Sequence, residues 1–175
     1  MPEMIDIYDA HRNRIGRTCE RGTQMKEGEY RLVVYAWLLN QKNEVLLTRR
    51  HPSKVWGDYW ECTAGHVQAG ENSLEGALRE LREEVGVEAD GQDGILIRQE
   101  TDGSVFVDMW LFHTETPAEN LILQPSEVTD AKWAGRQEYE TMCRKGLLVP
   151  ACTEFTSWRE EKRKTDESGN NQAVL

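Results

Sequence analysis

The apolar residues of this chain fall into short runs separated by polar turns, a pattern typical of a protein built on a β-sheet. The strongest run is EYRLVVYAWLLN (29–40), whose nearly continuous Val, Leu and aromatic residues indicate a strand buried on both faces. A polar turn, QKNE, follows it, and VLLTRR (45–50) predicts the next strand. Further strands are expected at YWECTA, GILIRQE, SVFVDMWLFHT and VTDAKWA, which begin at positions 59, 94, 104 and 128.

A helix is predicted directly after YWECTA, because apolar residues there recur at the three-and-four spacing of a single helical face. That face is formed by Leu74, Ala77, Leu78, Leu81 and Val85. Asn72 or Ser73 can cap the start of this helix, and Gly86 suits the left-handed position just beyond its end. Two later helices are expected, one over residues 136–144 and one around 154–163.

Strands on both sides of one helix, with more helices afterwards, predict an α+β fold with a mixed β-sheet flanked by helices. The alternating apolar residues of MIDIY (4–8) indicate a small N-terminal hairpin before that sheet. With 175 residues and 38% hydrophobic content, the chain suits one domain, expected over 1–165 with its core at about 28–145. The polar segment 166–175 is expected to be a flexible tail.

Charge and composition narrow the function classes. Thirty-one acidic against 21 basic residues give a net charge of −10, which excludes a general basic footprint for nucleic acid or an anionic membrane. No apolar run approaches the ~20 residues that cross a bilayer, no signal-like segment opens the chain, and the four cysteines lack zinc-binding spacing. We expect a cytoplasmic protein. To bind a polyanionic substrate, it would need a local source of positive charge such as metal ions.

The predicted helix carries an unfavourable cluster of acidic residues, Glu80, Glu83 and Glu84, near its C-terminal end. Each like-charge pair costs roughly 0.2–0.5 kcal/mol, and each carboxylate near that end of the helix dipole costs about 0.3–1 kcal/mol. Two sources of compensation are open. Arg79 can reach Glu83 one turn on and Glu75 one turn back, and a divalent cation can bind the carboxylates.

The helical wheel places the three glutamates away from the apolar face, where their carboxylates can converge above the loop that leads into the helix. Three hard oxygen ligands in one cluster suit Mg²⁺, which is commonly shared with substrate phosphates. Gly65 and Gly70 bracket HVQA and allow a tight turn or exposed carbonyl groups before the helix. Glu71 can pair with Arg79 and lock this loop onto the helix.

The full spacing of this segment is a known signature. Gly65, five residues, Glu71, seven residues and then RELREEVGV, ending at Val87, matches every defined position of the Nudix box. The chain therefore resembles the Nudix superfamily, and the flanking pattern is similar to a Nudix domain over most of residues 28–145.

The resemblance implies an α/β/α sandwich of the Nudix type and hydrolysis of a nucleoside diphosphate linked to another moiety, with Mg²⁺ or Mn²⁺ as cofactor. It implies that Glu83 and Glu84 are the principal metal ligands, that Glu80 is a ligand or the general base, and that Gly65 offers a carbonyl ligand. It also assigns Glu71 and Arg79 to holding the geometry of loop and helix. The reaction would be metal-assisted attack of water on phosphorus.

The N-terminal hairpin and the segment TRRHPSKVWGDYWECTAGH are more particularly similar to the isopentenyl-diphosphate isomerase branch of the superfamily. This similarity implies that Arg50 and Lys54 grip a diphosphate and that His66 matches a metal-binding histidine. The catalytic cysteine of that branch, however, falls at Ala64, and another metal-binding histidine falls at Arg31. Isomerisation is therefore not expected, and the intact Nudix box favours an isomerase-like Nudix hydrolase.

Three further residues are candidate substrate contacts. Trp56 and Tyr59 lie in the loop before YWECTA and are better placed to touch a substrate than the tryptophans in strands. Glu127, in PSEVTDAKW, lies where several Nudix enzymes place an additional acidic residue, and the alternative is a solvated loop carboxylate.

The expected partner is a small-molecule diphosphate, with no nucleic acid and no membrane, and a homodimer is left open. A non-catalytic nucleotide-binding Nudix domain is the alternative from another class. Such a domain would be expected to lose its catalytic carboxylates, and all are present here. The sequence leaves open the substrate, the number of metal ions and which glutamate is the base.

Overall fold

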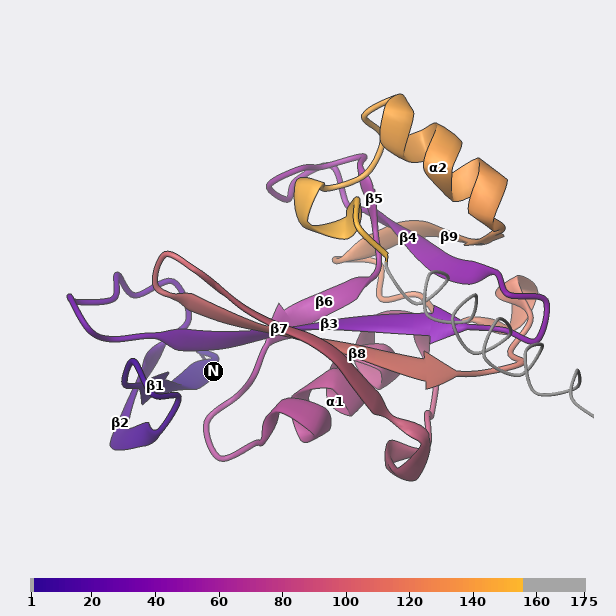
Figure 1. Cartoon of the computed structure of the whole chain (residues 1–175). Helices are drawn as coiled ribbons and strands as arrows, with labels where there is room; N and C mark the ends of the chain where they lie inside the picture. Colours follow the sequence, from indigo (N-terminus) through magenta and orange to yellow (C-terminus); the bar gives the residue numbers. More distant parts are fainter. Residues whose placement is uncertain (1, 156–175) are drawn as a thin grey trace, which may run out of the picture.

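The long apolar run of the sequence forms the central strand, β3 (Arg31–Leu39), in the computed structural model, which describes residues 2–155. Along one edge, β3 pairs in parallel with β8 (Val105–His113) over its whole length. Its other edge is shared. β6 (Thr63–His66) pairs with its first half, whereas β4 (Val45–Arg50) meets it only at its last residue, where Leu39 lies opposite Val45. β4 therefore diverges from β3, as Figure 1 shows.

The remaining strands complete a mixed sheet. β7 (Ile95–Asp102) pairs antiparallel with β8, while β9 (Val128–Ala134) and the short β5 (Trp60–Glu61) pair antiparallel with β4. Among the described residues these strands make one seven-stranded sheet, in which β3 and β8 are the parallel pair. Every strand expected from the sequence is present, although YWECTA is divided between β5 and β6.

One helix covers each face of the sheet (Figure 1). α1 (Ser73–Val85) packs on the face formed by the even-numbered residues of β3, and α2 (Arg136–Arg144) packs on the other, against Trp37 and Leu39. The expected α/β/α sandwich is confirmed. Two further expectations, the tail at 166–175 and all but the first two residues of the helix at 154–163, lie outside the described residues. No helix of the described part is both long enough and apolar enough to span a membrane.

Both ends of α1 follow the sequence signals. The Asn72 side chain accepts a hydrogen bond from the Glu75 amide at 3.0 Å, and the Glu75 carboxylate accepts one from the Asn72 amide at 2.7 Å, which makes a reciprocal capping box. Gly86 adopts a left-handed φ of 70° and donates its amide proton to the Arg82 carbonyl. Of the two glutamates within reach of Arg79, Glu75 is used in this cap, and among the described residues Arg79 pairs with Glu83 and not with Glu75.

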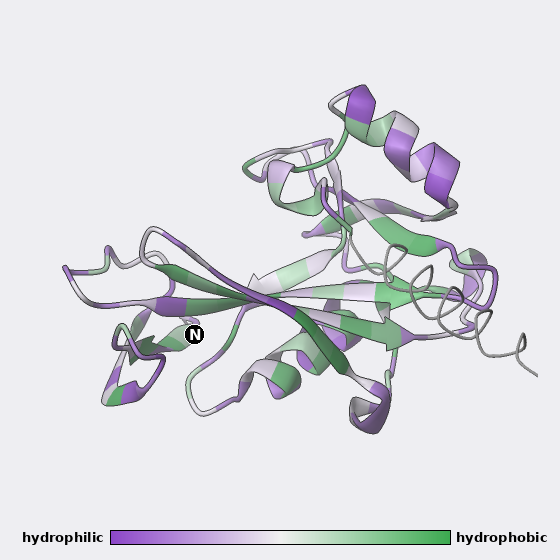
Figure 2. Cartoon of the chain, viewed as in Figure 1, coloured by the Kyte–Doolittle hydropathy of each residue, from purple (hydrophilic) through white to green (hydrophobic). Residues whose placement is uncertain are grey.

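The N-terminal hairpin is present and holds the loop that precedes α1. Its strands are β1 (Met4–Tyr8) and β2 (Arg14–Glu20), paired antiparallel. The Met4 carbonyl accepts a hydrogen bond from the Ala69 amide at 2.8 Å, and the Asp6 carboxylate accepts one from the Gly70 amide at 2.8 Å. Figure 2 shows green apolar segments of this hairpin, and Ile5, Ile7 and Tyr8 are buried.

The capping box gives the first testable prediction. Asn72→Ala removes the acceptor for the Glu75 amide and should destabilise the protein by about 1 kcal/mol, which lowers the melting temperature by roughly 2–4 °C for a chain of this length. Asn72→Asp keeps an acceptor at the same position and serves as the matched control in thermal unfolding. Equal melting temperatures for Asn72→Ala and the wild type would show that the cap does not contribute.

Candidate functional site

The site is built where β6 leads into α1. Gly65 lies in β6, and a β-carbon there would collide with the carboxylate of Glu80 on α1. Only glycine therefore allows that carboxylate to lie against the backbone of the strand. Gly65 of β6 and Glu80 of α1, both implied by the family resemblance to be site residues, therefore lie next to each other.

Arg79 is the main organiser of the site. Its guanidinium donates to both oxygens of Glu71 at 2.8 and 3.1 Å, to Glu80 Oε1 at 2.9 Å, to Glu83 Oε2 at 3.1 Å and to the His66 carbonyl at 2.8 Å. Burial alone would lower the pKa of Arg79, but the hydrogen bonds that it donates to Glu71 and the charge of Glu80 raise this pKa above its usual value. The expected Arg79 bridges to Glu71 and Glu83 are present.

Glu84 differs from its neighbours because it has no such partner. It is 6% exposed, and its Oε2 atom is buried without a hydrogen bond among the described residues. Burial, followed by the charges of Glu80, Glu61 and Glu127, raises the pKa of Glu84 well above its usual value. The structure thus holds a buried carboxyl group among other carboxyl groups.

The exposure of the three box glutamates corrects the sequence interpretation. They were expected on an outward helix side, but Glu80 and Glu84 are buried and only Glu83 is exposed. All three line a cavity of about 160 Å³ together with Gly65. The described residues nevertheless contain no group of three or more His, Cys, Asp or Glu side chains arranged to hold a metal ion. Arg79 is the local counter-charge and forms ion pairs with Glu80 and Glu83.

The residues of this cavity fit a divalent cation in their chemistry. They supply hard carboxylate oxygens, one of which, Glu84 Oε2, is buried and unsatisfied, beside a strand glycine whose carbonyl is a further oxygen donor. Glu127 also lines this cavity.

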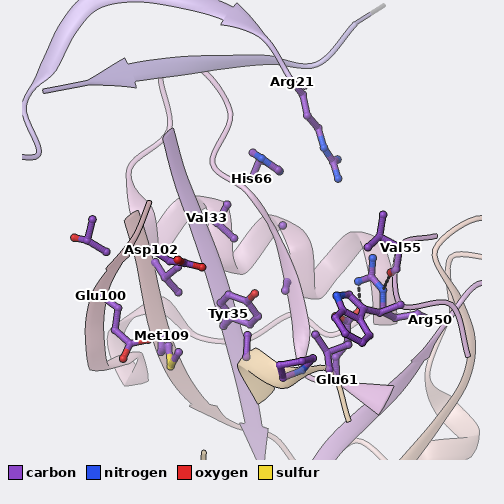
Figure 3. Close-up of a pocket in the computed structure, with 18 residues that line it drawn as sticks. Arg21, Val33, Tyr35, Arg50, Val55, Glu61, His66, Glu100, Asp102 and Met109 are labelled. Atoms are coloured by element: carbon purple, nitrogen blue, oxygen red, sulfur yellow. Dashed lines mark hydrogen bonds and ion pairs between the residues drawn. The ribbon is translucent and has the colours of Figure 1, made fainter. Parts of the chain in front are cut away.

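A second, larger cavity of about 710 Å³ adjoins the first, and both are lined by Arg21, Ala64 and Gly65. Its floor comes from β3, β6, β7 and β8, and its walls come from the loop after β4 and from residues 149–151. Figure 3 shows the labelled side chains of Tyr35 and Val33 between His66 and Glu61. The size is that of an ordinary small-molecule site.

The two basic residues predicted to grip a diphosphate are both paired. Arg50 lines the larger cavity, donates to Glu61 at 2.5 Å and also donates to the Val55 carbonyl at 2.8 Å. Lys54 is not among the residues lining either cavity and forms an ion pair with Glu127. Burial outweighs the effect of Arg50 and raises the pKa of Glu61 to about 7.

The two predicted aromatic contacts occupy different places. Trp56 lines the larger cavity, is 47% exposed and has a left-handed φ of 59°, which is rare for a bulky residue. Tyr59 does not line that cavity and instead packs edge-on against Trp56, with ring centroids 5.2 Å apart.

The positions that distinguish this chain from the isomerase branch also lie at the larger cavity. Ala64 and His66 line it, and burial together with Arg21 and Arg31 lowers the pKa of His66 to about 4. Cys62 is fully buried, 3.7 Å from Cys152 between the two sulfur atoms, so its thiol belongs to the core and does not replace the thiol missing at Ala64.

Three cavity residues were not singled out from the sequence. Glu61 could have been identified from the sequence, because it is a charged residue within the otherwise apolar run of a predicted strand. Tyr35 carried no such signal, because it alternates regularly within β3 and is typical of a core residue. Arg21 follows the hairpin strand β2, and only the tertiary structure brings it to the cavities.

Comparison with known proteins agrees with this geometry. The family model described as NUDIX domain matches residues 29–152. An uncharacterised Nudix hydrolase of Listeria monocytogenes is 31% identical over 152 residues, which cover 85% of this chain and 89% of the relative. An isopentenyl-diphosphate delta-isomerase of Escherichia coli is 42% identical over 59 residues, 33% of this chain and 32% of the isomerase.

The fold has a close counterpart among solved structures. The crystal structure of the Deinococcus radiodurans protein DR0079 matches with a TM-score of 0.69 at 23% identity, covering 84% of this chain and 92% of that one. The family match spans the strand, loop and helix that carry Gly65, Glu71 and the glutamate cluster. The chain therefore belongs to the Nudix family and is a hydrolase that acts on diphosphate bonds.

Proposed function

We propose that this protein is a Mg²⁺-dependent pyrophosphohydrolase, with Mn²⁺ as an alternative cofactor. It cleaves the diphosphate linkage of a nucleoside diphosphate derivative or a related organic diphosphate by attack of water on phosphorus. When bound, the cation would polarise a phosphoryl oxygen and lower the pKa of the attacking water.

The observation that carries this proposal is the environment of Glu84. A buried carboxyl group with an unsatisfied oxygen and three carboxylate neighbours is unfavourable in a folded protein. A divalent cation would supply the missing positive charge at this point and satisfy the free oxygen. The metal ligands in this proposal are Glu84, Glu83 and the Gly65 carbonyl, and of the two roles implied for Glu80 we propose that of general base.

The chain itself supplies the geometry and a proton acceptor. Arg79 fixes Glu80 through Oε1, which leaves Glu80 Oε2 free of hydrogen bonds in the described structure. Burial raises the pKa of Glu80, with Arg79 opposing that effect, so this carboxylate is a better base than an exposed one. We assign Glu80 Oε2 as the atom that accepts a proton from water. Arg79 and Glu71 hold the loop and helix in register.

Substrate contacts follow from the two cavities. Arg50 and Trp56, which line the larger cavity, are proposed to contact the substrate. Lys54 and Tyr59 are proposed to act indirectly. Lys54 forms an ion pair with Glu127, and the ring of Tyr59 packs against Trp56. Glu127 lines the smaller cavity and is proposed as an additional carboxylate near the cation.

The alternatives are less well supported. Isomerisation would need a thiol where Ala64 stands, and the adjacent Cys62 is buried in the core. A domain that only binds its ligand would not require a buried, unsatisfied oxygen at Glu84, because this oxygen lowers the stability of the folded protein. In the proposed hydrolase the same oxygen is a metal ligand.

The activity prediction uses Glu84→Gln, which removes the charge at nearly constant volume. Phosphate release from a panel of ADP-ribose, dinucleotide polyphosphates, nucleotide sugars and nucleoside triphosphates would be measured with Mg²⁺ and with Mn²⁺. We expect the variant to lose turnover by at least about 100-fold, since several kcal/mol of charge stabilisation depend on the bound cation. Mn²⁺ binding, followed by electron paramagnetic resonance, should weaken in parallel.

The matched control is Glu88→Gln, which removes an exposed carboxylate just beyond α1. It should retain both turnover and Mn²⁺ binding. Turnover near the wild-type level in Glu84→Gln would remove Glu84 from the metal site and with it the main support for the proposed chemistry.

A second prediction concerns pH, because Glu61 belongs to the same acidic cluster. Its pKa is about 7 in the folded protein against about 4.3 when unfolded. Protonated Glu61 therefore stabilises the folded protein fully at pH values below the pKa of Glu61 in the unfolded chain. This stabilisation is lost as the pH rises through the folded pKa of about 7. In buffer containing a chelator, the contribution of this residue should lower the free energy of unfolding of the metal-free protein by about 0.8 kcal/mol between pH 6.5 and 8. The melting temperature should fall by roughly 2–3 °C.

The measurement is the slope of melting temperature against pH in that window. Glu61→Gln should flatten the slope by this amount, whatever its absolute stability, whereas Glu88→Gln should keep the wild-type slope. The lowered pKa of His66 acts in the opposite direction in all three proteins and cancels in the comparison. Equal slopes for Glu61→Gln and the wild type would contradict a raised Glu61 pKa.

A further inference from the structure

The larger cavity, about 710 Å³, has a defined position relative to the proposed chemistry. It meets the carboxylate cluster at Ala64, Gly65 and Arg21, which line both cavities. A diphosphate at the junction would have its scissile bond on the side of Glu80 and Glu84 and could extend its organic group into the larger space. The inference below rests on the proposed diphosphate hydrolysis.

The floor of this cavity includes the first half of β3, whose odd-numbered face is covered by neither α1 nor α2, the two α-helices of the described residues. Trp37 and Leu39, in the second half of the strand, pack against α2, whereas Val33 and Tyr35 lie on the same face and line the cavity. In the sheet register Tyr35 lies opposite Ala64 on one side and Met109 on the other. The cavity floor is therefore largely apolar around a single phenol ring.

The Tyr35 hydroxyl group is free to bind a ligand. No hydrogen bond to it is found among the described residues, and it is not one of the buried polar atoms that lack a partner. The hydroxyl group is thus open to the cavity, where Figure 3 shows the ring between Val33 and Glu61. Burial raises the pKa of Tyr35, so the hydroxyl stays protonated and can donate.

The charged residues around the cavity limit what can enter. Arg21 is paired with Glu3 at 2.8 Å, and Arg50 is paired with Glu61 at 2.5 Å. Asp102, at the rim, has no ion-pair partner in the described part of the chain. With Arg21 at the position proposed for the diphosphate, a second anionic group in this space would meet Arg50, which is paired with Glu61, and the free carboxylate of Asp102, which opposes its binding.

We propose that the larger cavity binds the organic half of the diphosphate substrate, that this half carries hydrogen-bonding groups but no negative charge, and that Tyr35 determines specificity by hydrogen-bonding it. The diphosphate lies at Gly65 and Arg21, and the organic half lies over Tyr35 with Trp56 as the exposed wall. Tyr35 therefore contacts the organic group and not the phosphates.

The test is Tyr35→Phe, which removes only the oxygen atom. For the best organic diphosphate found in the screen, the variant should raise KM by about 3–10-fold, the effect of one lost hydrogen bond, while kcat stays within about twofold. The inhibition constant of inorganic pyrophosphate, which has a diphosphate but no organic half, should not change. Tyr30→Phe is the matched control, because Tyr30 stacks on Phe106 and lines neither cavity.

A rise in the pyrophosphate inhibition constant equal to the rise in KM would overturn the proposal, because Tyr35 would then hold the diphosphate. An unchanged KM would overturn it as well. Calorimetric binding of nucleoside 5′-monophosphates and sugar phosphates tests the cavity without turnover. Tyr35→Phe should weaken the best of these ligands by the same factor.

The charge requirement has its own comparison. A nucleoside 3′,5′-bisphosphate should bind at least about tenfold more weakly than the matching 5′-monophosphate, and tighter binding of the bisphosphate would overturn the charge argument. No binding by any monophosphate would overturn the assignment of the cavity even if hydrolysis is found. Binding without hydrolysis of any diphosphate would instead contradict the proposed function alone.

Discussion

The structure depends on one constraint, the need to keep several carboxyl groups close together next to the backbone of a strand. Arg79 meets this constraint by binding Glu71, Glu80, Glu83 and a backbone carbonyl with one planar group. Lysine could not do so, because it lacks the fixed fork of donors. The arrangement leaves Glu84 outside the network, and the site is therefore stabilised everywhere except at the point where we place the cation.

The second determinant of function is the incomplete cover of the sheet. β4 touches β3 only at the end of the latter, and α2 lies over that diverging part. Over the first half of β3 neither of the described α-helices covers this face, which forms the floor of the larger cavity. The divergence of two neighbouring strands thus places a ligand-sized space directly beside the carboxylate cluster.

Much of this could be predicted from the sequence, because the relevant signals are local. The cap at Asn72, the left-handed Gly86 and the loop-to-helix bridge from Glu71 to Arg79 each depend on residues within one or two helical turns. The burial of Glu84 could not be predicted, since segment 121–127 reaches it from far along the chain. Tyr35 was hidden for a related reason. Periodicity shows that a face is apolar, but tertiary packing decides whether that face is covered.

The hydrogen bonds from the N-terminal hairpin to the active-site loop have a consequence for how the family domain is delimited. The family match begins at residue 29, yet the amides of Ala69 and Gly70 are satisfied by Met4 and Asp6. The loop that leads into α1 is thus held by a segment that lies outside the range matched by the family model. In this protein the matched domain and the hydrogen-bonded unit have different borders, and a change in the hairpin can shift this loop without altering any residue of the Nudix box.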